Sequence, residues 1–186
     1  MARYAVVLDA CVLVPVTLAD TLLRVAEHNL YRPLWTSRII DEAAGAIAEI
    51  HPDISRERIR QRFTAMDDAF EDARIEGYEG LIDGVTLPDP DDRHVVAAAL
   101  QGRGDSIVTA NIRHYPESVL DPLNIDVIHP DSFLLDQLDL APALILDVLY
   151  QQAAHTRRPP LSPVDVVARL ARAGAPSFAD EVGRMI

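Results

Sequence analysis

The feature that most constrains the fold is a series of short strand-like runs separated by stretches with helical periodicity. The first run, Ala5-Val6-Val7-Leu8, is apolar throughout, which is typical of a strand buried on both faces of a sheet. Further short strands are expected at residues 84–88, 106–109 and 125–128. Strands that alternate with helices predict an α/β fold in which helices cover both faces of a parallel sheet.

The helices between these strands begin at recognisable capping residues. Thr36 or Ser37 can cap the helix that follows a short extended link at 31–35, and Ser55 can cap a longer helix that follows. Asp131 or Ser132 can cap a helix that runs to residue 138. From about residue 140 the pattern contains only helices, expected at 142–154, 163–173 and 177–185. The sequence therefore predicts an α/β domain at 1–139 and a helical C-terminal extension at 140–186.

Composition narrows the functional classes. The net charge of −12 argues against a protein held to nucleic acid mainly by a basic surface, although it allows a nuclease whose cations neutralise its site locally. Cys11 is the single cysteine, so no intramolecular disulfide can form, which suits a reducing cytoplasm. The N-terminal apolar run is too short for a signal peptide, and no run reaches the ~18 apolar residues of a membrane span. A cytoplasmic location without membrane contact is expected.

Polar residues follow the predicted strands where a parallel sheet would bring them together. Asp9 comes directly after the first strand, Asp92 begins a helix, and Asn111 follows the strand at 106–109. The carboxyl ends of parallel strands share one edge, where open α/β folds bind ligands. Glu42 lies in the first turns of a helix and can lean toward that edge. Such converging oxygen ligands favour Mg²⁺ or Mn²⁺.

Each of these residues also has an ordinary structural explanation. Asp89 and Asp91 are plausible helix caps, and capping is the favoured role for Asp91. Asn111 could simply form a turn. Thr109 and Ser37 could hydrogen-bond the acids or a substrate phosphate, but plain capping explains them equally well. The joint placement at strand-to-helix junctions is therefore the stronger argument.

Other chemistry-bearing residues are less informative. His94 and His114 lie close to the acids in the sequence, but a lone histidine on a helix is commonly a surface or satisfied core residue. Cys11 is expected to be a small buried hydrophobe. The arginine cluster at 56–62 is either a solvated helix face or a contact for RNA or an acidic partner. The sequence contains neither a glycine-rich phosphate loop nor a Cys/His zinc spacing.

Several stretches together resemble the PIN domain. They are VLD (7–9), WTSRIIDE (35–42), DPDDRH (89–94) and VTAN (108–111), followed by NIDV (124–127) and HPDSFL (129–134). The resemblance covers roughly residues 3–137 and keeps the order of the motifs. Within that superfamily the chain looks like the VapC-type ribonuclease toxins of bacterial toxin–antitoxin pairs.

The resemblance implies a three-layer α/β/α fold with a parallel sheet and Mg²⁺- or Mn²⁺-dependent endoribonuclease activity, carried by the domain at 1–139. The first three acids of the family match Asp9, Glu42 and Asp92. The fourth position is commonly an aspartate but is Asn111 here, which offers a carbonyl oxygen without charge. Some relatives place an acid three residues later, where this chain has His114. With one carboxylate fewer, a second metal is expected to bind more weakly, or to bind to Asp89 and bound phosphate.

The leading hypothesis is a VapC-type toxin in which Asp9, Glu42 and Asp92 hold the metal, with Asp89 and Asn111 assisting. The metal would lower the pKa of a bound water that attacks phosphorus. RNA is the expected substrate, a basic antitoxin the expected partner, and a homodimer the expected assembly. The alternatives are a degenerate PIN module that binds RNA or protein without cleavage, and a PIN nuclease of RNA processing. A phosphatase with an aspartyl nucleophile is disfavoured, because such enzymes usually have a second acid two residues after the first, and this chain has Cys11 at that position.

Overall fold

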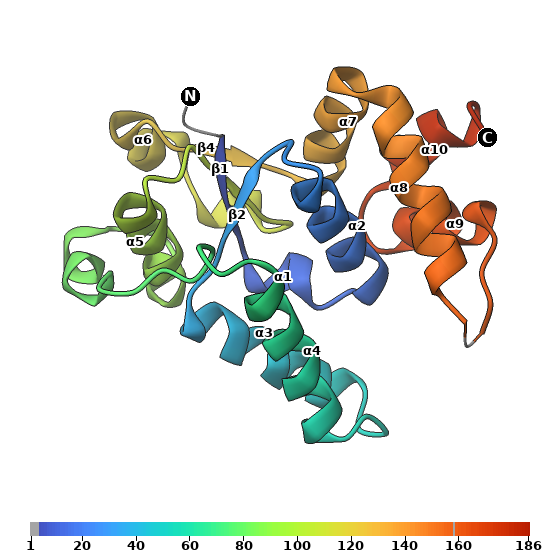
Figure 1. Ribbon diagram of the computed structural model, residues 1–186. Coiled ribbons are helices and arrows are strands. Elements are labelled where there is room, and N and C mark those ends of the chain that lie inside the picture. The colour runs from blue at the N-terminus through green and yellow to red at the C-terminus, as the bar shows by residue number, and fades with distance from the viewer. Residues whose placement is uncertain (1–3, 158) are drawn as a thin grey trace.

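The computed structural model describes residues 4–157 and 159–186, and its centre is a four-stranded parallel sheet (Figure 1). The strands lie in the order β2-β1-β3-β4. Val7 of β1 pairs with Leu34 of β2 and with Ile107 of β3, so β1 occupies an interior position. Both of its faces are buried, which explains its uninterrupted apolar run. The strands are β1 (Ala5–Leu8), β2 (Arg32–Leu34), β3 (Ser106–Val108) and β4 (Asp126–Ile128).

Two sequence expectations about strands change in the structure. Residues 31–35, expected as an extended link, contribute the edge strand β2, a position that tolerates Pro33. The strand expected at 84–88 is wrong, because the chain there leaves the 3₁₀ helix η1 (Glu79–Gly84) and runs on as a loop. Val85 and Leu87 are nevertheless buried on either side of the exposed Thr86. A loop anchored at alternate residues therefore has the same sequence pattern as a strand.

Helices cover both faces of the sheet, which confirms the predicted α/β/α architecture. In Figure 1, α5 and α6 lie on one side of the strands, while α2 and α7 lie on the other. Thr36 caps α3 by accepting a hydrogen bond from the Ile39 N–H, and Ser55 caps α4. The cap of α7 is His129, not Asp131 or Ser132, because its Nδ1 accepts the Asp131 N–H. The helices of this part are α1 (Ala10–Leu13), α2 (Val16–Glu27), α3 (Ser37–Ile50), α4 (Arg56–Ala69), α5 (Arg93–Gly102), α6 (Glu117–Leu120) and α7 (Pro130–Leu140).

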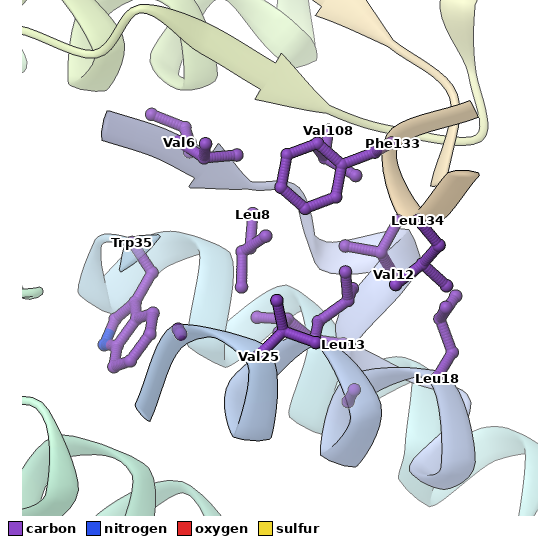
Figure 2. Close-up of a cluster of buried hydrophobic side chains, with 14 of the residues drawn as sticks. Val6, Leu8, Val12, Leu13, Leu18, Val25, Trp35, Val108, Phe133 and Leu134 are labelled. Atoms are coloured by element: carbon purple, nitrogen blue, oxygen red, sulfur yellow. The ribbon is translucent and has the colours of Figure 1, made fainter. Parts of the chain in front are cut away.

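The core is built from side chains of the sheet and of the helices around it. Figure 2 shows Leu8 of β1, Val12 of α1 and Phe133 of α7 among its members, all of them essentially inaccessible to solvent. Tyr31 packs edge-on against Phe133, and its hydroxyl donates to the carbonyl oxygen of Leu22. The buried hydroxyl is thus satisfied, so this polar group does not destabilise the core.

The C-terminal helices extend this core. They are α8 (Pro142–His155), α9 (Pro163–Arg172) and α10 (Pro176–Gly183), close to the ranges expected from the sequence. Gln152 of α8 accepts a hydrogen bond from the Thr21 hydroxyl of α2 and donates to the Thr17 carbonyl oxygen. The Asp131 carboxylate of α7 accepts the N–H groups of Ser177 and Phe178 at the start of α10. Buried residues of α8, α9 and α10 therefore belong to the same hydrophobic cluster as those of the sheet.

The arginine cluster at 56–62 divides into two kinds of side chain. Arg56, Arg58 and Arg60 are exposed on α4. Arg62 is partly buried and donates from Nη2 to the carbonyl oxygen of Leu13 at 2.5 Å, so it joins α4 to the end of α1.

No helix in the described ranges combines the length and apolarity needed to cross a bilayer.

Candidate active site

Asp9 is held firmly at the carboxyl end of β1. It is 5% exposed, and its Oδ1 accepts the Ala10 N–H, which makes Asp9 the cap of α1. Its Oδ2 accepts a 2.7 Å hydrogen bond from the hydroxyl of Thr109, which occupies the equivalent position after β3. The Tyr115 hydroxyl lies 3.5 Å from the same oxygen. Neighbouring parallel strands thus place and orient one carboxylate at the edge where ligands bind.

A second group of ligand atoms comes from the loop before α5 and from the turn after β3. Asp89 caps the 3₁₀ helix η2 (Pro90–Asp92), and its Oδ1 accepts the Asp91 N–H. The Oδ2 of Asp92 lies 2.7 Å from Nδ1 of His114, which ends the 3₁₀ helix η3 (Ile112–His114). Asp89, Asp92 and His114 can each offer one ligand atom, all within 4.8 Å of one another. Two carboxylate oxygens and an imidazole nitrogen at such spacing fit a divalent cation.

The electrostatics of these groups favour binding of a cation. Burial raises the pKa of the Asp92 carboxyl, the charge of Asp9 adds to this effect, and the hydrogen bond with His114 only partly offsets it. Burial, followed by the charges of Asp9 and Asp92, also raises the pKa of the Tyr115 phenol. The negative charges of Asp9 and Asp92 are therefore close enough to act on each other and on Tyr115. A bound cation would relieve their mutual repulsion.

Glu42 stands in the second turn of α3 and is anchored through one oxygen. Arg38 Nε lies 3.0 Å and His94 Nε2 lies 3.1 Å from the same atom, Oε1. Burial raises the pKa of Glu42, but the hydrogen bonds and charges of His94 and Arg38 outweigh burial, so the pKa is lowered. Arg38 also donates to the carbonyl oxygen of Asp91 at 3.2 Å, which ties α3 to the loop that carries the aspartates.

The remaining predicted residues take different positions. Thr109 is completely buried and touches Asp9 directly. Asn111 is partly buried; its N–H donates to the Thr109 hydroxyl and its carbonyl oxygen accepts the His114 N–H. Ser37 is exposed at the first residue of α3, beside the capping Thr36. The structure thus joins Asp9 to Thr109 and places Asp89 near Asp92, whose pKa the charge of Asp9 raises. Arg38 connects Glu42 to the loop of Asp91, and Ser37 is exposed.

Cys11 touches the site without the features of a reactive thiolate. Its sulfur lies 3.4 Å from the Thr109 hydroxyl and accepts the Ala110 N–H. Burial, followed by the charge of Asp9, raises the pKa of the Cys11 thiol to about 11. The thiol therefore stays protonated at neutral pH and acts as a partly buried packing residue, as expected from the sequence.

Four residues that the sequence analysis did not select contribute to the site. Arg38 had a detectable signal, because it precedes Glu42 by four residues and such pairs meet on one helix face. His94 was visible as a histidine within an apolar helix, and it is 1% exposed with Nδ1 lacking a partner among the described residues. His114 was visible as a residue close to the acids, at a position where some relatives have an acid, but its contact with Asp92 exists only in the folded chain. Tyr115 gave no local signal, because its contact with Asp9 also requires the fold.

Two family models and one curated relative match parts of this chain. A family model described as "PIN domain" matches residues 5–113, and a second, described as "VapC50 C-terminal domain", matches residues 130–184. A curated relative from Mycobacterium tuberculosis (strain ATCC 25618 / H37Rv), named "Putative ribonuclease VapC50", is 39% identical over 94 residues. That alignment covers 50% of this chain and 55% of the relative, so the chain spans about half the length of that protein. No solved structure matches the chain significantly. From the match over residues 5–113 and the parallel sheet described above, the chain belongs to the PIN domain family.

Proposed function

We propose that this chain is a metal-dependent endoribonuclease and the toxin of a VapBC-type toxin–antitoxin pair. The observation that carries the proposal is the cluster of Asp89, Asp92 and His114 in a PIN domain, together with Asp9, whose charge acts on Asp92. The likeness to a protein named as a putative ribonuclease supports RNA as the substrate. Mg²⁺ or Mn²⁺ is the proposed cofactor.

In this proposal each residue has a defined task. Asp9, Asp92 and Glu42 hold the metal, with Asp89 and the Asn111 side chain assisting. A divalent cation in such a site supplies Lewis-acid chemistry: it lowers the pKa of water and offsets charge on a phosphodiester. The chain's own contribution is to fix the ligands in advance, so that little reorganisation remains when substrate binds.

Orientation of the carboxylates is built from paired contacts. The Thr109 hydroxyl and the Ala10 N–H each hold one oxygen of Asp9. Arg38 and His94 both contact Oε1 of Glu42, and in this proposal its Oε2 binds the metal. Ser37 begins the 14-residue helix α3, and its exposed hydroxyl lies where a helix N-terminus favours an RNA phosphate.

The proposed partners follow from charge and family. A basic antitoxin segment would complement a chain whose net charge is −12 and would bind across the acidic site. A homodimer is the proposed assembly. Co-expression with the product of a neighbouring small gene should abolish toxicity, and size-exclusion chromatography with light scattering should give twice the mass of one chain.

The deciding experiment measures cleavage of a structured RNA by the purified chain with Mn²⁺ and with Mg²⁺. Asp9→Asn keeps the shape of the side chain and removes its charge, so cleavage should be lost. Asp41→Asn is the matched control, because Asp41 is an exposed acid on α3 outside the described contacts of the site. If Asp9→Asn cleaves as fast as the parent protein, the proposed metal site is wrong.

A second candidate function is favoured by one observation. Asn111 brings no charge where a fourth carboxylate is common, which fits a PIN module that binds RNA or protein without cleaving it. Calorimetric titration with Mn²⁺ separates the two functions: absence of binding at millimolar metal would support the non-catalytic module. A PIN nuclease of RNA processing would instead cleave in a metal-dependent way without being toxic when expressed alone.

A further inference from the structure

The proposed metal site contains an unusual ligand type for a site built on aspartates. We propose that His114 binds the metal through a ring nitrogen and thereby makes the site prefer Mn²⁺ over Mg²⁺. This inference rests on the proposed metal-dependent function and adds a specificity-determining residue to it. The sequence places His114 three residues after Asn111, and the structure brings it beside Asp92.

The backbone around His114 holds the ring toward the acids. Its N–H donates to the carbonyl oxygen of Asn111, which closes the turn of η3 directly after β3. The side chain is 27% exposed, and its Nδ1 lies 2.7 Å from Oδ2 of Asp92, so the ring faces the site while one side meets solvent. A bound ion therefore needs no large movement of the chain to reach this nitrogen.

The spacing of the ligand atoms is suited to one ion. Atoms of Asp89, Asp92 and His114 lie within 4.8 Å of one another. Opposite ligands of an octahedral ion with bonds of about 2.1 Å are separated by about 4.2 Å. Adjacent ligands of such an ion are about 3.0 Å apart. The Oδ2 of Asp92 and the Nδ1 of His114, which are 2.7 Å apart, already have nearly this separation, and side-chain rotation can bring Asp89 to the same ion.

The donor types decide which ion gains most. Mg²⁺ is a hard cation that prefers oxygen ligands and keeps much of its water, whereas imidazole nitrogen suits first-row transition ions better. Neither Asn111 nor an uncharged His114 adds negative charge at the position where an acid is common. Mg²⁺ loses electrostatic affinity through this replacement, while Mn²⁺ recovers part of the loss through its bond to nitrogen.

A purely structural role makes a different prediction. If His114 only hydrogen-bonds the Asp92 carboxylate, it orients that ligand without touching the ion. Metal affinity would then fall for Mn²⁺ and Mg²⁺ alike when His114 is replaced. The two roles therefore differ in the ratio of the affinities and in whether nitrogen is bound to the ion.

The test combines spectroscopy with calorimetry on the full chain. Pulsed electron paramagnetic resonance of the Mn²⁺ complex should show coupling to a directly bound ¹⁴N nucleus, which His114→Asp should remove. The exposed His51 at the end of α3 provides the control His51→Gln, which should keep the coupling. In calorimetry, His114→Asp should lower the ratio of Mn²⁺ to Mg²⁺ affinity, because a carboxylate oxygen then replaces the nitrogen ligand.

The outcomes separate this inference from the proposed function. Mn²⁺ bound without ¹⁴N coupling in the unmodified chain would overturn the role of His114 and leave a carboxylate metal site intact. An unchanged affinity ratio in His114→Asp would do the same. Failure of the unmodified chain to bind Mn²⁺ at all would overturn both proposals. The spectrum of the unmodified chain decides the point even if a variant folds poorly.

Discussion

Replacing Leu149 with alanine tests whether the C-terminal helices and the PIN domain unfold as one unit. Leu149 is completely buried on α8, the helix that carries Gln152 against Thr21 of α2. Because α2 also belongs to the core around the sheet, a cavity at Leu149 should weaken the whole chain. The sequence predicts a boundary near residue 140, whereas shared packing of α2 with α8 argues for common unfolding.

The size of the effect follows from the complete burial of the side chain. Leucine-to-alanine changes at such positions cost about 3–4 kcal/mol, because transfer and cavity terms add. With a urea dependence of about 2–3 kcal/mol per molar, the unfolding midpoint should fall by about 1–2 M. Leu140→Ala is the matched control, since Leu140 is 67% exposed at the end of α7 and its loss should cost less than about 0.5 kcal/mol.

The single tryptophan of the chain makes the measurement specific. Trp35 is fully buried beside Phe70 in the α/β part, so its fluorescence reports unfolding there, while far-ultraviolet circular dichroism reports all helices. Leu149→Ala should shift both transitions equally. If circular dichroism shows an early transition while the Trp35 midpoint stays unchanged, the two parts unfold separately and the shared-core reasoning is refuted.

Further predictions concern buried contacts and the acids of the site. Asp67→Ala removes the acceptor of the buried Trp35 Nε1 and should cost about 2 kcal/mol in urea unfolding, whereas Asp67→Asn, which keeps an acceptor, should cost less than half as much; equal losses would contradict this. His94→Leu removes a contact that lowers the pKa of Glu42, so the acidic limb of the cleavage pH profile should move to higher pH, and an unmoved limb would exclude this role. The pKa of Asp92 is raised by burial, so its contribution to stability is greatest below its ordinary pKa and is lost as pH rises through the raised value. At neutral pH with chelator, Asp92→Asn should therefore have a higher melting temperature than the parent protein. Mn²⁺ at about 100 times its Kd should stabilise only the parent protein, by about 2.7 kcal/mol. A lower melting temperature for Asp92→Asn would contradict the predicted direction of the effect.

The predictable part of the fold is the part whose signal is local. The apolar run of β1 followed by Asp9 predicts a buried parallel strand that delivers a carboxylate to a sheet edge, and the structure has this arrangement. Residues 84–88 mislead because Val85 and Leu87 are buried alternately, although no strand within residues 4–157 and 159–186 pairs with them. Pairing is a property of two segments, so the pattern of one segment does not determine it.

The candidate site likewise combines residues that the local sequence predicts with contacts that only the folded chain brings about. The sequence predicts Asp9 directly after one strand and Thr109 at the end of another, and parallel topology then brings them into contact. The contact between His114 and Asp92 depends on the direction in which η3 turns, which no local pattern specifies. The approach of Arg38 to the Asp91 carbonyl likewise requires α3 and the η2 loop to be already packed.

The distance along the chain between the partners of Asp9 has a consequence for protein synthesis. Asp9 and the Thr109 hydroxyl that orients it are separated by 100 residues. At about 5–20 residues per second, Thr109 leaves the ribosome several seconds after Asp9. Until then β1 also lacks its pairing with β3, the strand that Thr109 follows. A growing chain therefore carries its first carboxylate without the contact that orients it, and translation itself postpones the moment at which the candidate site is complete.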